Sequence, residues 1–301
     1  MDIRDYGFEP QRVEVLDSSR IKDFVDCPSM FYLRHILGLV PTVIDPQYET
    51  RYTWGSAWHR LLHVYYREGE DIVKALEALE EIFPSYVTPD QDKYKRGKER
   101  MIKAFFDYLE KWKSKLDGIE ILRHEQFFDV YSEKDDLRWC GRIDSVRRRI
   151  KTGSIVPWDY KTSSVMGPMY FDQHEVGFQF PGYVWATDQM MGGEGEVKEI
   201  TIDVMYMISK TVELRQKTFR YDSARIKEWV RNVKWWIAII MRLQDEHLYD
   251  PEAWGKNWNE CTRYGRCQYF DVHSITPRGY ARMNILRHSY KIDRWDPLDS
   301  G

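Results

Sequence analysis

The sequence predicts an α/β (α+β) fold in which a central mixed β-sheet is flanked by helices. Residues 119–131, 137–150 and 154–161 have the composition of three consecutive strands, and 197–208 and 212–221 alternate as a second pair. Segments with apolar residues at helical spacing stand before, between and after these strands. This order of elements fits layers of helices packed on one sheet.

Helices are expected over residues 20–36, 54–68, 71–83, 92–116, 170–191 and 222–247. Ser18 and Ser19 would cap the first helix and Asp222 the last, because their side-chain oxygens can accept from free backbone N–H groups. Cys27-Pro28 should interrupt the first helix, since proline lacks an amide donor. Residues 41–50 are predicted to form a polar loop, and the tail after Pro251 is predicted to be irregular.

Composition limits the function classes. The chain has 301 residues, of which 43% are hydrophobic, and this is enough for a sizeable core. Its formal net charge of −3 excludes a global basic field, so nucleic acid would have to bind local patches. One patch is formed by Arg147, Arg148, Arg149 and Lys151. The other, which also fits an ordinary solvated helix face, is Lys93, Lys95, Arg96, Lys98, Arg100 and Lys103.

Nothing in the sequence predicts a membrane segment or a secretion signal. It has no run of about twenty apolar residues, and residues 1–5 lack a hydrophobic signal core. Four cysteines in a chain of this length do not make a disulfide scaffold. We therefore expect a cytoplasmic protein whose cysteines are reduced or bound to metal.

The most informative segment is a predicted hairpin that carries Asp144 on one strand and Asp159 and Lys161 on the next, joined by a turn at 151–154. Alternation along a strand places Asp159 and Lys161 on one face and Tyr160 on the other. Carboxylates suit a hard Mg²⁺ or Mn²⁺ ion, and a lysine can bind phosphate or orient water. The hairpin thus predicts metal-assisted phosphodiester hydrolysis; a surface hairpin with ordinary charges is the alternative.

Further residues support the hairpin. His59 follows Gly55 at the start of a predicted helix and could reach a metal ion. Glu125 lies on the first predicted strand and is expected to support the site from behind the metal ligands or to lie on the surface. Gln179 and Tyr183 stand one helical turn apart, where they could hold a phosphate or a base edge. Each of these residues, taken alone, also fits an ordinary structural role.

Together these residues resemble the PD-(D/E)XK nuclease superfamily, and more narrowly its RecB-type branch, which includes CRISPR-associated adaptation exonucleases and their phage relatives. The matching segments are residues 18–33, Gly55 to His59, Gly141 to Asp144, Asp159 to Lys161, and Gln179 to Tyr183. The resemblance implies a restriction-endonuclease-like core. It also implies a single nuclease domain over 1–301, with a helical N-terminal region at 18–116, a catalytic core at 117–247 and a tail at 248–301.

The resemblance also implies roles for the motif residues. His59, Asp144, Asp159 and the backbone carbonyl of Tyr160 would hold one or two Mg²⁺ or Mn²⁺ ions. Lys161 would orient or help deprotonate the attacking water and stabilise charge on the phosphate. The same family pattern has Gln179 and Tyr183 positioning the substrate strand and the lysine.

The RecB-type branch often carries a 4Fe–4S cluster, with one N-terminal cysteine and three C-terminal ones. This chain departs from that pattern, because the candidate ligands are Cys27, Cys261, Cys267 and His273. Such a set could hold iron–sulfur or, less favourably, zinc, and would pin the tail to the N-terminal helix. Free thiols with an aromatic-packed tail remain the alternative.

The leading hypothesis is a metal-dependent DNA nuclease, an exonuclease that processes DNA ends or single strands in recombination, repair or phage DNA metabolism. Its partner would be DNA, and it could also form a homo-oligomer or bind a recombination or repair protein. It would act in the cytoplasm of a bacterium or of a phage-infected cell. The alternatives are a non-catalytic DNA-end-binding subunit of a larger complex, a structural iron–sulfur or zinc protein, and a sequence-specific restriction endonuclease.

Overall fold

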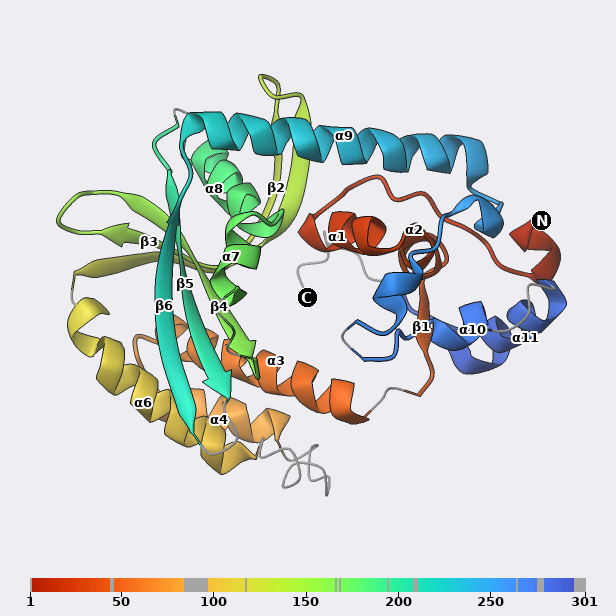
Figure 1. Cartoon of the computed structure of the whole chain (residues 1–301). Helices are drawn as coiled ribbons and strands as arrows, with labels where there is room; N and C mark the ends of the chain where they lie inside the picture. Colours follow the sequence, from red (N-terminus) through yellow and green to blue (C-terminus); the bar gives the residue numbers. More distant parts are fainter. Residues whose placement is uncertain are drawn as a thin grey trace. The chain divides into compact units, whose positions relative to one another are not determined.

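The computed structural model describes residues 2–43, 46–83, 97–116, 118–165, 167, 169–193, 195–207, 211–263, 265–274 and 279–294. The chain divides into two compact units (Figure 1). The first comprises residues 1–44, 129–141 and 227–301, and the second comprises 45–128 and 142–226. Each unit is described by itself below.

A five-stranded sheet forms the centre of the fold, in the order β2-β3-β4-β5-β6. Its strands are β2 (Ile119–Ser132), β3 (Leu137–Arg149), β4 (Ile155–Ser163), β5 (Glu199–Met207) and β6 (Val212–Arg220). Strand β4 pairs with β3 antiparallel and with β5 parallel, whereas β5 and β6 are antiparallel. The sheet is therefore mixed, and the predicted fold class is confirmed. All five strands lie within two residues of their predicted bounds, although residue 208 is outside the described residues.

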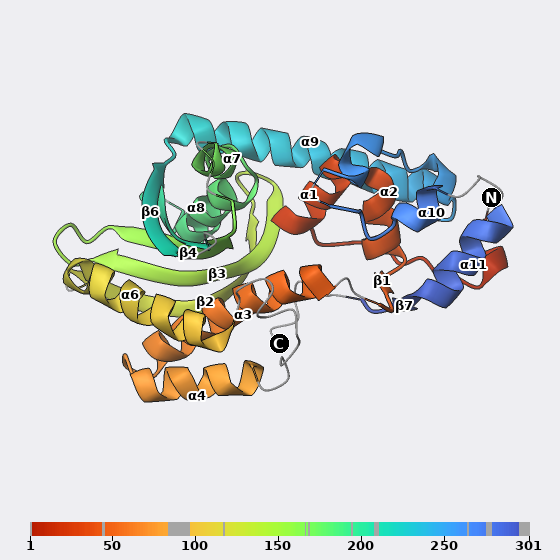
Figure 2. The ribbon, with the colours of Figure 1, turned by 60° about the horizontal axis from the view of Figure 1, so that its bottom comes forward.

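In the second unit, helices pack on both faces of the sheet (Figures 1 and 2). Helices α3 (Pro46–Arg67), α4 (Ile72–Ile82) and α6 (Lys98–Leu116) share an apolar core with β4, β5 and β6. Buried aromatic rings such as Trp58, Tyr108 and Trp158 fill this core. Helices α7 (Tyr170–Glu175) and α8 (Gln179–Met190) connect β4 to the parallel strand β5. This crossover is what permits two neighbouring strands to run parallel.

One loop prediction and two helix predictions need correction. The predicted loop at 41–50 is wrong in part, because α3 begins at Pro46. The helix predicted over 170–191 is two helices, separated at residues 176–178, where the chain includes Gly177. The helix predicted from residue 92 is described from Lys98 onward, and residues 92–96 lie outside the described residues.

The first unit contains the N-terminal helices and most of the C-terminal tail. Helix α1 (Ser18–Asp26) ends before Cys27, and α2 (Pro28–Phe31) continues into a π-helical turn (Tyr32–Ile36), so the predicted interruption is confirmed. The cap of α1 is Asp17, whose carboxylate accepts from the backbone N–H of Arg20 at 2.7 Å; the prediction of Ser18 and Ser19 was wrong. Helix α9 (Ser223–His247) is capped by Asp222, as predicted.

The tail is more regular than its composition predicts. It forms short 3-10 helices at Pro251–Ala253 and Trp258–Cys261, then α10 (Phe270–Ser274) and α11 (Gly279–Ser289). Strand β7 (Tyr290–Ile292) pairs antiparallel with β1 (Leu39–Pro41). The Arg294 guanidinium donates to the carbonyls of Ile36 and Glu9 at 2.9 and 2.8 Å. These contacts fix the end of the described chain to its N-terminal part.

No helix among the described residues is both long and apolar enough to span a bilayer.

Asp71→Ala should destabilise the protein by about 1 kcal/mol, because it removes an N-cap. The Asp71 carboxylate accepts from the backbone N–H groups of Val73 and Lys74 at 2.9 and 3.1 Å. Urea unfolding measures the loss. Glu77→Ala, on the exposed side of the same helix, is the control and should change stability little. Equal stability of the two variants would contradict the capping argument.

Candidate metal centre and active site

Strands β3 and β4 bring Asp144 next to the strand that carries Asp159 and Lys161. Ser145 pairs with Trp158 in the antiparallel ladder, so Asp144 and Asp159 follow as the next opposed residues. The carboxylate of Asp144 accepts a hydrogen bond from the backbone N–H of Tyr160 at 2.7 Å. Lys161 Nζ lies 2.7 Å from Asp159 Oδ2 as an ion pair. Two carboxylates and an ammonium group therefore occupy one patch of the sheet.

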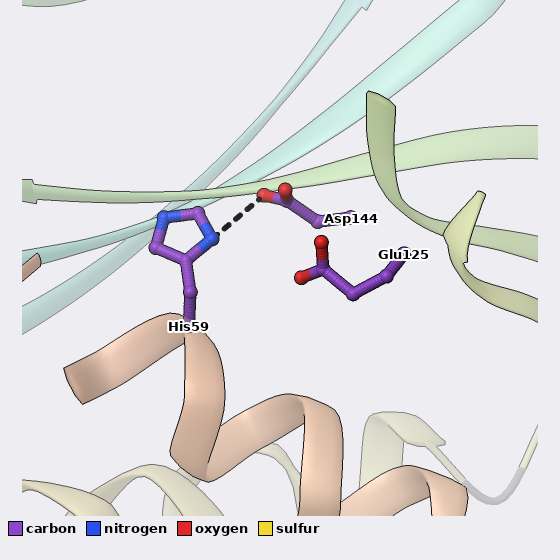
Figure 3. A group of neighbouring side chains, drawn as sticks. All are labelled: His59, Glu125 and Asp144. Atoms are coloured by element: carbon purple, nitrogen blue, oxygen red, sulfur yellow. Dashed lines mark ion pairs between the residues drawn. The ribbon is translucent and has the colours of Figure 1, made fainter. Parts of the chain in front are cut away.

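A second group of donors surrounds Asp144. One ligand atom each from His59, Glu125 and Asp144 lies within 4.8 Å of the other two, and Figure 3 shows His59 pointing from α3 toward the two carboxylates. His59 Nδ1 is 3.4 Å from Asp144 Oδ2. One imidazole and two carboxylates form a donor set that fits a divalent cation. In this group Glu125 stands where Asp159 was predicted, and Asp159 is instead paired with Lys161.

Glu125 reaches the site because of an unusual backbone conformation. Its φ of 44° is positive although it lies within strand β2. A left-handed conformation at a non-glycine residue breaks the regular side-chain alternation of a strand and costs of order 1–3 kcal/mol. Arg142 Nε pairs with the Glu125 carboxylate at 3.2 Å, while the arginine side chain remains 60% exposed. Sequence reasoning gave Glu125 only a supporting role, because no local pattern predicts positive φ at a glutamate.

Mutual charge sets the ionisation of these groups. The pKa of Asp159 is raised to about 6, because removal from water and the charge of Asp144 together outweigh the opposing effect of Lys161. The pKa of Glu125 is also raised, by burial and then by Asp144. For His59 and Asp144 burial is outweighed by their mutual attraction, so the pKa of His59 is raised and that of Asp144 is lowered. Each carboxylate has a cationic partner in Lys161, Arg142 or His59. The raised pKa values of Asp159 and Glu125 show that burial and repulsion from Asp144 still disfavour their charged forms.

Helix α8 fixes strand β3 from the other side of the site. The Tyr183 hydroxyl donates to the carbonyl of Arg142 at 2.7 Å, and Gln179 Nε2 donates to the same hydroxyl at 2.9 Å. Lys161 Nζ lies 5.7 Å from the centre of the Phe180 ring. Gln179 and Tyr183 therefore hold the backbone two residues before Asp144, where the resemblance had implied contact with substrate.

Comparison with known proteins agrees with this geometry. The family model for the PD-(D/E)XK nuclease superfamily matches residues 18–272. The chain belongs to the PD-(D/E)XK nuclease superfamily. Its mixed sheet flanked by helices is consistent with the restriction-endonuclease-like core expected for such a nuclease.

Other comparisons add little to this assignment. A solved structure, "Crystal structure of SSO0001", is similar to this nuclease with 14% identity and a TM-score of 0.30, over 77% of this chain and 95% of that chain. None of the curated proteins matches.

The predicted basic patch beside the hairpin is largely engaged within the protein. Arg147 is fully buried, so the prediction that it contacts DNA was wrong. Arg148 and Arg149 pair with Glu120 and Glu199 at 2.8 and 2.9 Å, and Lys151 is exposed. Of the second patch, Lys93, Lys95 and Arg96 lie outside the described residues. Its remaining members make contacts of their own: Lys98 with Glu80, Arg100 with the carbonyl of Thr211, and Lys103 with Asp107.

The cysteines of the tail lie near Cys27 in the first unit. The pKa of the Cys267 thiol is raised by burial and further by Cys261 and Cys27, so the three thiols lie close enough to influence one another. The backbone N–H of Tyr269 donates to Cys267 Sγ at 3.5 Å. The Nε2 of His273 shares a 3.0 Å hydrogen bond with the Ser29 hydroxyl, so this residue would have Nδ1 to offer as a ligand. Cys140 is buried, as a small core residue would be.

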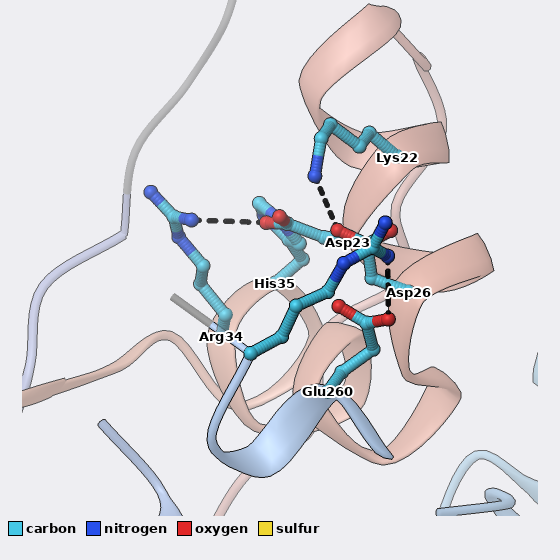
Figure 4. A network of polar contacts seen from close by, with 7 residues as sticks. Lys22, Asp23, Asp26, Arg34, His35 and Glu260 are labelled. Carbon is cyan, nitrogen blue, oxygen red and sulfur yellow. Dashed lines mark hydrogen bonds and ion pairs between the residues drawn. The ribbon is translucent and has the colours of Figure 1, made fainter. Parts of the chain in front are cut away.

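The acidic side chains near these cysteines form ion pairs with basic residues (Figure 4). Their pairs are Asp23 with Arg34 at 3.0 Å and His35 at 2.8 Å, Asp26 with Lys22, and Glu260 with Arg263 at 2.8 Å. Sulfur ligands of tetrahedral zinc lie about 3.8 Å apart. Among the described residues, the cysteine set does not form a group of three donors within 4.8 Å. A closed zinc site therefore does not fit this arrangement.

Asp159→Asn should raise the melting temperature of the metal-free protein by a few degrees near pH 8. The pKa of Asp159 is raised to about 6 from 3.8, so the stability it contributes is full below about pH 4 and is lost as the pH rises through about 6. The advantage of the variant should therefore shrink near pH 5. Thermal unfolding with EDTA at both pH values measures this.

The control for this experiment is Asp107→Asn, which changes a half-buried carboxylate on α6 that pairs with Lys103. This variant should not raise the melting temperature to a comparable extent at either pH. A variant Asp159→Asn that is equally stable to wild type at both pH values would show that this carboxylate carries no electrostatic strain.

Proposed function

We propose that this protein is a divalent-metal-dependent deoxyribonuclease that shortens DNA from its ends. The observation that carries the proposal is the convergence of His59, Glu125 and Asp144 beside the Asp159–Lys161 pair. That convergence occurs in a chain of the PD-(D/E)XK nuclease superfamily. The action on ends, and a role in recombination, repair or phage DNA metabolism in the cytoplasm, rest on the RecB-type motifs of the sequence.

His59, Glu125 and Asp144 would hold the cation, with Asp159 available nearby once a positive ion offsets its repulsion from Asp144. Carboxylate oxygens suit Mg²⁺ and Mn²⁺, and an imidazole ligand favours Mn²⁺ of the two. A bound cation supplies Lewis-acid stabilisation of charge on the phosphate oxygens. Burial and repulsion from Asp144 disfavour the charged forms of Asp159 and Glu125, and relief of this cost is the electrostatic reason for a cation to bind here.

Lys161 is the cationic group that the chain itself contributes to the reaction. Its ammonium lies 2.7 Å from Asp159, and its side chain is 23% exposed, so it can turn from Asp159 toward a phosphate. There it would donate hydrogen bonds to a non-bridging oxygen and orient a water for attack on phosphorus. His59 would keep the Asp144 carboxylate in place from helix α3.

The decisive experiment incubates the purified protein with end-labelled single-stranded DNA, duplex DNA, RNA and covalently closed circular DNA. Each is tested with EDTA, Mg²⁺ or Mn²⁺. Linear DNA should be degraded in the presence of Mn²⁺ or Mg²⁺, and circular DNA should survive. Asp144→Ala and Lys161→Ala should each lower the rate by at least about 10²-fold while the protein stays folded, because they remove cation binding or charge stabilisation.

Asp71→Ala, which alters only a helix cap, is the matched control and should retain wild-type activity per folded molecule. Cleavage that survives EDTA would exclude the metal mechanism. Cleavage of circular DNA would show that the protein is an endonuclease and not an exonuclease. Binding of DNA ends without product in any metal would favour the alternative, a non-catalytic DNA-end-binding subunit.

We also propose that Cys27, Cys261 and Cys267 hold an iron–sulfur cluster in the first unit. The support is geometric: the backbone N–H of Cys267 donates to the carbonyl of Cys261 at 2.8 Å, and Cys267 Sγ accepts an N–H···S bond, a contact that tunes such clusters. Cys27 adds to the raised pKa of the Cys267 thiol. Anaerobically purified protein should then be brown and contain iron, and Cys261→Ser should remove both. Cys140→Ser, at a buried cysteine outside this set, should keep the colour. Colourless, iron-free wild-type protein would leave the three residues as packed thiols.

A further inference from the structure

The β3–β4 hairpin carries a buried charge on the face of the sheet to which Asp144 does not point. Arg147 is 0% exposed. Its guanidinium carbon lies 4.2 Å from the centre of the Trp158 ring and 5.1 Å from that of Tyr66. Its Nε donates to the Ser145 hydroxyl at 3.2 Å, whereas its Nη1 has no hydrogen-bond partner among the described residues. Burying an ion in this way costs several kcal/mol before its partners compensate, so a charged residue at this position needs a physical explanation.

The compensation comes from the surrounding core of the second unit. Asp203, 4% exposed, lies on β5 opposite Tyr160 and supplies the opposite charge. Its carboxylate accepts from Gln216 at 2.7 Å, Trp158 at 2.8 Å and Tyr108 at 3.2 Å. Burial alone would lower the pKa of Arg147, but Tyr160, neighbouring tyrosines and Asp203 outweigh it and raise the pKa. The arginine therefore stays charged.

Tyr160 connects this buried charge to the metal centre. Arg147 Nη2 donates to the Tyr160 hydroxyl on one face of the sheet. On the other face, the backbone N–H of the same tyrosine donates to Asp144 at 2.7 Å. Tyr160 is also the residue between Asp159 and Lys161, so its backbone orientation decides where both side chains point. An apolar pair of similar volume would fill the core with less desolvation, so packing alone does not explain the arginine.

We propose that Arg147 is a positioning residue for the metal centre: by holding the Tyr160 hydroxyl it fixes the β4 backbone and sets the spacing of Asp144, Asp159 and Lys161. This inference rests on the proposed function, since it concerns the geometry of the same site. Arg147 touches neither cation nor DNA, and its effect passes through Tyr160.

The test compares Arg147→Met, Arg147→Lys, Tyr160→Phe and the Arg147→Met/Tyr160→Phe double variant with wild type. Three quantities are measured: Mn²⁺ affinity by electron paramagnetic resonance, kcat and KM for linear DNA, and amide hydrogen exchange of Tyr160 in ¹⁵N-tyrosine-labelled protein. Loss of one signal in Tyr160→Phe assigns the resonance. Arg147→Met should speed exchange at Tyr160, weaken Mn²⁺ binding and lower kcat by about 10–100-fold, the range for groups that orient metal ligands, with little change in KM.

The double variant should lose no more Mn²⁺ affinity and no more kcat than the more impaired single variant, because the two groups act as one unit. Arg147→Lys keeps the charge and should recover part of the Mn²⁺ affinity. Tyr108→Phe is the matched control: it removes the buried hydroxyl that bonds Asp203 and Tyr66 in the same network and leaves the Arg147–Tyr160 hydrogen bond in place. It should lower the melting temperature and leave Mn²⁺ affinity and Tyr160 exchange unchanged.

A purely structural role would make Arg147→Met behave like Tyr108→Phe, and this result would overturn the inference. If Arg147→Met does not fold, Arg147→Lys and Tyr160→Phe still decide, since unchanged Mn²⁺ affinity in both would overturn it. Failure of the proposed function has a different signature. Wild-type protein would then leave DNA intact, while slow Tyr160 exchange that is lost in Arg147→Met would still support the positioning role.

Discussion

The hydrogen bond from the backbone N–H of Tyr160 to the carboxylate of Asp144 is the contact on which the rest of the site depends. It joins the two strands of the hairpin at the point where their motifs meet. A hydrogen bond to a charged acceptor contributes about 1.5–3 kcal/mol, but its geometric consequence is larger. It places Asp144 beside the two residues, His59 and Glu125, that arrive from distant parts of the chain.

The site gathers groups that repel one another in the absence of a cation. Asp159 and Glu125 both have a raised pKa, and Glu125 occupies a left-handed backbone conformation inside a strand. Such a cluster is unfavourable for the fold and favourable for binding a positive ion. The aromatic core behind the sheet offsets this cost, and the tie from Arg147 to Tyr160 holds the strained face in register with it.

Two features that the sequence-based predictions did not include have the same origin. The prediction that Arg147, Arg148 and Arg149 form one basic patch is wrong because Arg147 packs into the aromatic core, while Arg148 and Arg149 pair with Glu120 and Glu199. Arg147 lies on the face of β3 that Asp144 does not occupy, against the rings of Trp158 and Tyr66. His273 was chosen for its position in the sequence, but the fold turns its imidazole to Ser29. A spacing pattern fixes order along the chain and leaves orientation undetermined.

The sequence by itself determined the strands, the hairpin and the order of the nuclease motifs, because alternation, turn residues and helix caps are local signals. It determined that Asp159 and Lys161 share a face, since this needs only the two-residue period of a strand. The tertiary structure decided that Glu125 joins His59 and Asp144, that Tyr183 bonds the carbonyl of Arg142, and that Arg147 is buried. All three depend on long-range packing, and the first also depends on the positive φ of Glu125. The neighbouring residues alone encode neither.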